Sequence, residues 1–200
     1  MAFALLASVQ TSYADQIDDI IKQQTPIRDD AIAKCESLKL MGVDCSRIAM
    51  NFDARRDDFD DTVILDAKAV RLNEDHDTDG ITDFSITCSR AGIYVGFPAS
   101  LAPYTKNERT TDIRYRFGKG EPVSSTLYVG EGSSLWVTYV FGRDDGLEFL
   151  NTLIEDGEGN FVVEVTPKVG RAMKSRFVIV NGAEVAKAAL QICPTTTEFK

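Results

Sequence analysis

The segment TDIRYRF, residues 111–117, gives the clearest indication of the fold, because apolar and charged side chains alternate along it. The apolar positions are Ile113, Tyr115 and Phe117. The charged positions are Asp112, Arg114 and Arg116. Such alternation predicts a β-strand with one face in a core and the other in solvent. Arginines on a solvent-exposed strand face ordinarily have no binding role. If they belong to a contiguous exposed patch, Arg114 and Arg116 become the candidate partner-binding residues.

The segments around this strand follow the same pattern. Strands are predicted at residues 62–65, 69–72, 84–88, 92–97, 124–129, 135–141, 160–166 and 174–180. Apolar residues at helical spacing predict helices over 144–154 and 182–192. Because most strands follow one another through turns rather than alternating with helices, a parallel sheet is disfavoured. We predict an α+β fold, a mainly antiparallel sheet or sandwich with a C-terminal helix and a small N-terminal helical segment.

The sequence of the N-terminal region predicts short helices followed by a linker. Asp15 is suited to cap a first short helix, and Pro26 is suited to begin a second one. The charged residues 53–61 predict an exposed connection. We therefore divide the chain into a signal peptide at 1–14, an N-terminal helical segment with linker at 15–60, and an antiparallel β-rich domain at 61–200.

The first residues, MAFALLASVQTSYA, predict export. They are uncharged and apolar, and Ser12 and Ala14 occupy the −3 and −1 positions of a signal-peptidase site. The alternative is a short buried helix. The run is too short to span a bilayer, and no later apolar run reaches that length. We expect a periplasmic or secreted protein with no membrane span in the mature chain.

Four cysteines, an even number, suggest two disulfides in an exported protein, and three connectivities are open. Cys35 and Cys45 lie near each other in a helical region, whereas Cys88 and Cys193 lie in a strand and at the end of the last helix. We favour Cys35–Cys45 and Cys88–Cys193. A zinc site is disfavoured, because the chain has no Cys-x-x-Cys pair and only one histidine.

The charge of the chain excludes some partners. The formal net charge is −9 and the isoelectric point is near 4.7. The chain also has no basic tract. Nucleic acids and anionic membranes attract proteins through clustered Lys and Arg. We therefore expect neither of them as a partner.

The most acidic stretch, DHDTDGITD at residues 75–83, predicts a calcium loop. Its carboxylates occupy positions 1, 3, 5 and 9 of such a loop: Asp75, Asp77, Asp79 and Asp83. Gly80 stands where the loop must turn, and the carbonyl of Ile81 would add one oxygen ligand. Position 12 is Ile86 rather than a bidentate Glu, and the flanking residues predict strands. The alternative is an acidic turn without Ca²⁺.

Enzymatic chemistry finds little support in the sequence. His76 is the only histidine, and no Gly-x-Ser-x-Gly turn is present. The many acidic residues keep one alternative open, a carboxylate-dependent hydrolase acting on an envelope or glycan substrate. We expect a protein that is not an enzyme.

The order of features from about Thr82 onward carries a family resemblance. It comprises a strand with one cysteine, a Tyr-Val strand, Arg-Tyr-Arg-Phe, a strand-helix-strand run, and a last helix ending at Cys193. This order, with the N-terminal pair Cys35 and Cys45, resembles the exported VasI/TagO-like accessory proteins associated with type VI secretion. The resemblance implies a non-catalytic exported accessory protein. Its partner would be a protein or glycan of the cell envelope.

Overall fold

The computed structural model describes residues 13–37, 44–56, 63–70, 82–89, 92–98, 109–131, 137–156, 159–166 and 172–193. The helices are α1 (Tyr13–Ser37), α2 (Cys45–Ile48), α3 (Arg143–Asp156) and α4 (Gly182–Ile192). The first strands are β1 (Asn51–Arg56), β2 (Val63–Val70), β3 (Thr82–Ser89), β4 (Gly92–Pro98) and β5 (Thr110–Phe117). The later strands are β6 (Val123–Glu131), β7 (Val137–Phe141), β8 (Gly159–Thr166) and β9 (Met173–Ile179).

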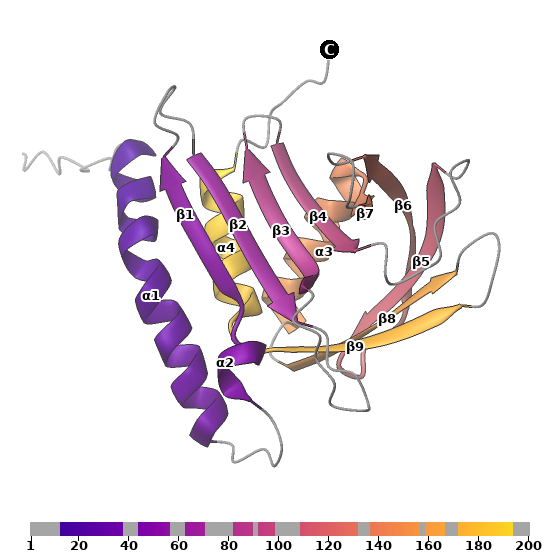
Figure 1. Ribbon diagram of the computed structural model, residues 1–200, viewed down its shortest axis with the longest axis horizontal. Helices are drawn as coiled ribbons and strands as arrows, with labels where there is room; N and C mark the ends of the chain where they lie inside the picture. The colour runs from indigo at the N-terminus through magenta and orange to yellow at the C-terminus, as the bar shows by residue number, and fades with distance from the viewer. Residues whose placement is uncertain are drawn as a thin grey trace, which may run out of the picture.

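The strands form one nine-stranded sheet in the order β1-β2-β3-β4-β7-β6-β5-β8-β9. Every neighbouring pair is antiparallel. Figure 1 shows that β1 to β4 run side by side, while β8 and β9 run across their direction at the other end of the sheet. The predicted α+β fold with a mainly antiparallel sheet is confirmed.

Aromatic rings connect the two ends of this curled sheet. The ring centroids of Phe84 on β3 and Phe97 on β4 lie 6.2 and 6.0 Å from that of Phe177 on β9. In the sheet order, by contrast, β9 is several strands away from β3 and β4. Phe149 of α3 is fully buried and lies 5.6 Å from Phe84 and 5.1 Å from Tyr115. The sheet therefore folds over an aromatic core, as the two layers of a sandwich do.

Strand β5 has the two faces that its sequence predicts. Burial alternates along it, with Ile113, Tyr115 and Phe117 between 2 and 5% exposed. Thr111 joins the buried side, and its hydroxyl donates a hydrogen bond of 3.1 Å to the carbonyl oxygen of Thr166. The bond satisfies a polar group that burial would otherwise leave costly.

Helices α3 and α4 contact each other and the sheet (Figure 1). Most of α4 is buried: Gly182, Ala183, Val185, Ala186, Ala188, Ala189 and Ile192. Gly182 permits a close approach, since a Cβ there would lie 2.9 Å from Cδ1 of Leu153 on α3. The predicted helices over 144–154 and 182–192 are confirmed.

The prediction of two short N-terminal helices is wrong. Helix α1 is continuous through Pro26 and has 25 residues. A proline inside a helix costs about 3 kcal/mol, through a lost hydrogen bond and a steric clash. Burial of Ile17 and Ile20 before Pro26, and of Ala31 and Cys35 after it, offsets that cost.

Within the described ranges, no helix combines the length and apolar character that a membrane crossing needs.

The prediction of a linker over 53–61 is wrong for its first residues, because Asn51–Arg56 forms the edge strand β1. The sequence did not predict this strand because most of its residues are charged or polar, and only Phe52 and Ala54 on it are buried. Side-chain amides from distant parts of the chain bind the backbone of this strand and of Met50, the residue before it. The N–H of Met50 donates to Oδ1 of Asn181 at 2.7 Å, and Nδ2 of Asn181 donates to the carbonyl of Met50 at 3.0 Å. The N–H of Ala54 donates to Oε1 of Gln24 at 2.8 Å.

Both favoured disulfides are present, and no cysteine of the chain is free. Cys35–Cys45 joins the end of α1 to α2. Cys88–Cys193 joins β3 to the end of α4 across a sequence separation of 105 residues. In the chain-entropy model, closing a loop of this length stabilises the fold by about 4–5 kcal/mol.

Candidate binding face

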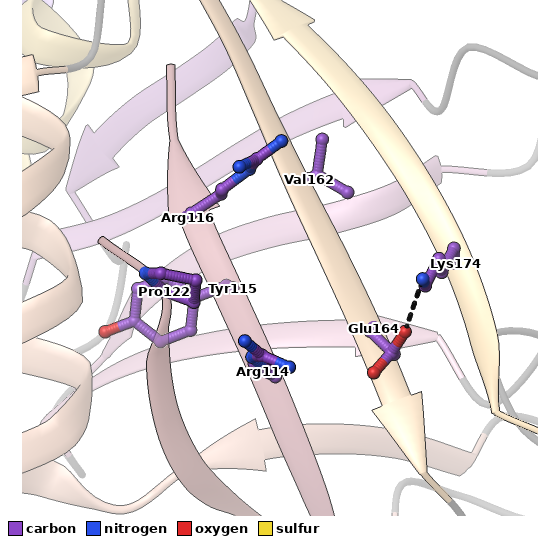
Figure 2. Close-up of a pocket in the computed structure, with 7 residues that line it drawn as sticks. All are labelled: Arg114, Tyr115, Arg116, Pro122, Val162, Glu164 and Lys174. Atoms are coloured by element: carbon purple, nitrogen blue, oxygen red, sulfur yellow. Dashed lines mark ion pairs between the residues drawn. The ribbon is translucent and has the colours of Figure 1, made fainter. Parts of the chain in front are cut away.

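The outward side chains of β5, β8 and β9 are aligned in rows by the strand register. The first row contains Arg114, Glu164 and Lys174. The second row contains Arg116, Val162 and Arg176. We call these six residues the basic face. Figure 2 shows five of them, together with Pro122 and Tyr115.

The alternation of each strand sends these residues outward. Their sequence neighbours on the same strands are buried in the core: Tyr115, Val163, Val165, Ser175 and Phe177. The four cations of the basic face are exposed, whereas Val162 and Glu164 are half-buried. A strand has only two sides, so burial of one side leaves the charged positions on the other.

A shallow hollow of about 220 Å³ lies on the basic face. Three of the four cations of the basic face line it, together with Glu164, Tyr115 and two apolar residues. The cations are Arg114, Arg116 and Lys174, and the apolar residues are Val162 on β8 and Pro122 in the turn before β6 (Figure 2). The structure thus brings the two predicted partner-binding arginines into one concave surface.

The basic face holds more cations than its carboxylate can neutralise. Nζ of Lys174 lies 2.9 Å from Oε2 of Glu164 (Figure 2). Glu164 is only 25% exposed, so its charge is held close to the surface of the sheet. In the part of the chain that the structure describes, no ion pair involves Arg114, Arg116 or Arg176. Four cations and one carboxylate make this face positive on a chain of net charge −9.

The positive charge increases along the strands. Asp112, two residues before Arg114, is aligned with Thr126 and Thr166, so this next row is negative. The row of Arg114 is mixed, and the row of Arg116 contains no carboxylate. Beyond it the chain turns at Gly118, whose φ of 48° favours glycine. The basic face is therefore most positive at its turn end.

Tyr115 lies between the two arginines in sequence but points into the core. Burial, and then the carboxylates of Glu148 and Asp145, raise its pKa to about 12. All three causes disfavour the phenolate. Tyr115 therefore stays neutral at physiological pH and contributes packing rather than charge.

One serine of the described residues lies beside a carboxylate, as two members of a catalytic triad do. The Ser125 hydroxyl donates to the Asp145 carboxylate and links β6 to the first turn of α3. A serine nucleophile requires a base such as histidine. His76, the sole histidine of the chain, lies outside the described residues. The described residues therefore do not assemble a triad at Ser125, and the carboxylate-dependent hydrolase stays a prediction from composition.

The predicted calcium loop also lies mostly outside the described residues, namely Asp75, Asp77, Asp79 and Ile81. For Asp83 only the backbone is described, as the second residue of β3. Elsewhere in the described ranges, no group of three or more His, Cys, Asp or Glu side chains gathers into a metal site. Calcium binding therefore remains a prediction.

The sequence alone did not associate Val162, Glu164, Lys174 and Arg176 with the two arginines. Strands over 160–166 and 174–180 were predicted, so the sequence alone assigned each of these residues to a strand. The missing information was the strand order, because β5 pairs with β8 although α3 and two strands separate them in sequence.

The fold and this face define a class: an α+β protein with two disulfides, a curled antiparallel sheet and a basic patch on its outer surface. A scan of the chain against protein-family models gives no match, and searches of the curated proteins and of the solved structures give none either.

Proposed function

We propose that this chain is a non-catalytic accessory protein that binds an acidic protein or glycan partner on its basic face. One observation carries the proposal. Arg114 and Arg116 flank a hollow and, within the described residues, have no carboxylate in ion-pair contact. Guanidinium groups form strong bidentate hydrogen bonds with carboxylate and phosphate groups. An acidic partner would supply the negative charge that the face lacks.

The size of the hollow favours a macromolecular partner over an enclosed small molecule. Pockets that enclose small ligands typically measure about 300–1,000 Å³. The hollow on the basic face measures about 220 Å³ and is open to solvent. It can receive a group that protrudes from a larger partner, with Val162 and Pro122 providing apolar contact. This geometry supports binding rather than catalysis.

An exported location fits this function. Two disulfides persist in oxidising compartments such as the periplasm or the extracellular space. The predicted signal peptide and the resemblance to type VI secretion accessory proteins point the same way. We propose a periplasmic or secreted protein that contacts a partner in the cell envelope, with a structural Ca²⁺ in the Asp75–Asp83 loop as a further proposal.

The test is a pair of charge reversals that differ only in position. Arg114→Glu with Arg116→Glu reverses the basic face. Lys22→Glu with Lys187→Glu makes the same change in charge at exposed positions on α1 and α4. Isothermal titration with poly-L-glutamate, for a protein partner, and with heparin, for a glycan partner, gives the affinity of each variant.

We expect the arginine variant to lose at least about tenfold in affinity for one of these polyanions. Hydrogen bonds to charged groups contribute about 1.5–3 kcal/mol each. The lysine variant should lose only the affinity that follows from its altered net charge, which is a much smaller loss. Equal losses in the two variants, or no binding of either polyanion by the wild type, would contradict the proposal.

A further inference from the structure

The two rows of the basic face differ in the residue at their centre. In the first row Glu164 stands between Arg114 and Lys174 and is ion-paired with Lys174. In the second row the residue between the two cations is Val162, which has no charge. The first row therefore contains its own anion, and the second row does not.

The second row also has two long side chains on either side of a short one. Arg116 and Arg176 arise from β5 and β9, which lie on either side of β8. Their backbones are about 9.5 Å apart, because each strand-to-strand spacing is about 4.8 Å. Both arginine side chains are long and exposed, and Val162, whose side chain is short and half-buried, stands between them in the row. The two guanidiniums can converge over Val162 on one anionic group.

We infer that Arg116 and Arg176 form a two-arginine clamp, over Val162, for one phosphoryl group of the acidic partner. This inference rests on the proposed function and specifies the ligand group. A single guanidinium matches a carboxylate with two parallel hydrogen bonds. Two guanidiniums match a phosphoryl group better, since it carries a charge of about −1.5 to −2 and three acceptor oxygens. The group would belong to a phosphorylated sugar of the partner, and inorganic phosphate shares its chemistry.

The test measures phosphate affinity in variants of the two rows. Inorganic phosphate and glucose 6-phosphate are titrated by ³¹P NMR, with acetate as the carboxylate control followed by calorimetry. Arg116→Gln and Arg176→Gln each remove one cation from the second row. Lys174→Gln is the matched control, because it removes one cation from the first row. Val162→Glu places a carboxylate where Glu164 stands in the first row.

We expect Arg116→Gln and Arg176→Gln each to weaken phosphate binding about tenfold or more. Lys174→Gln should change it less than about threefold, and Val162→Glu should abolish it. Acetate should bind more weakly than phosphate. If glucose 6-phosphate binds at least as tightly as inorganic phosphate, a phosphorylated sugar of the partner is the source. If it binds more weakly, the face binds free phosphate rather than a phosphoryl group of a partner, which overturns the inference.

Equal effects of Lys174→Gln and Arg176→Gln would overturn the clamp, because the cations would then act only as a diffuse positive field. Binding of acetate as tight as that of phosphate would also overturn it. Either result leaves the proposed function standing if polyanion binding still depends on Arg114 and Arg116. Loss of thermal stability in a variant is checked by its melting curve, and Lys187→Gln, at an exposed position on α4 outside the basic face, should bind phosphate as the wild type does.

Discussion

The inner and outer faces of strand β5 differ in what their side chains contact. On the inner face, Tyr115 and Phe117 lie 5.1 and 5.3 Å from the ring of Phe149. On the outer face, Arg114 and Arg116 are exposed to solvent around the hollow. The same segment thus supplies the core and the candidate binding surface at alternate positions. Substitutions on one face should change stability, and substitutions on the other should change binding.

The largest effect is expected at the centre of the inner face. Phe149→Ala removes a fully buried ring that contacts both halves of the sheet. The free energy of unfolding should fall by about 3–5 kcal/mol, from lost burial and the cavity left behind. Urea unfolding followed by circular dichroism measures it. Val162→Ala on the outer face is the control and should cost less than about 1 kcal/mol. A loss that small for Phe149→Ala would show that the inner face does not contribute more to stability than the outer face.

A smaller effect concerns pH and Tyr115. Its pKa rises from 10.0 in the unfolded chain to about 12 in the folded protein. Below pH 10 both states keep the proton, so stability is unaffected. Between pH 10 and 12 the unfolded state loses its proton first, so stability falls as pH rises. This residue should account for about 1 kcal/mol of the loss by pH 11.

The comparison of wild type with Tyr115→Phe isolates this contribution. Urea unfolding at pH 9 and pH 11 should show a smaller alkaline loss for Tyr115→Phe than for the wild type. Tyr128→Phe, at an exposed position on β6, should behave as the wild type does. An identical alkaline loss in the wild type and Tyr115→Phe would show that the phenol does not lie in the buried, acidic surroundings described.

Calcium should stabilise the fold without affecting the basic face. A loop without the bidentate Glu should bind weakly, with a dissociation constant of order 10⁻⁴–10⁻³ M. A tenfold excess of Ca²⁺ over that constant adds about 1.4 kcal/mol by mass action. Asp77→Ala and Asp79→Ala should each lose the rise in melting temperature, whereas Asp53→Ala on β1 should keep it. No rise in chelator-treated wild type would show that the loop is only an acidic turn.

The smallest effect on stability is expected at the outer face. Arg114→Gln with Arg116→Gln should change the free energy of unfolding by less than about 1 kcal/mol, since exposed substitutions away from buried contacts cost little. Urea unfolding at neutral pH measures it. A loss of several kcal/mol would show that the arginines support the fold, which would break the separation of the two faces.

Local pattern predicted the strands well, because alternation along segments such as residues 111–117 has one physical cause, burial of one side. The same reasoning missed β1, where charged residues surround Phe52 and Ala54, and the continuity of α1 through Pro26. In both cases contacts with distant elements decide the outcome, including the two hydrogen bonds between Met50 and Asn181. Arg114 and Arg116 were identified from sequence, but Val162 and Arg176 required the strand order.

We propose that the outer face of β5, β8 and β9 is where an acidic partner binds. The most direct test is a ¹H–¹⁵N NMR titration of the full chain with whichever of poly-L-glutamate and heparin binds more tightly, mapping the backbone amides that shift. We predict that the shifts cluster on Arg114, Arg116, Val162, Lys174 and Arg176 and their strand neighbours. Shifts scattered over the surface, or confined to α1 and β1 to β3, would contradict the claim.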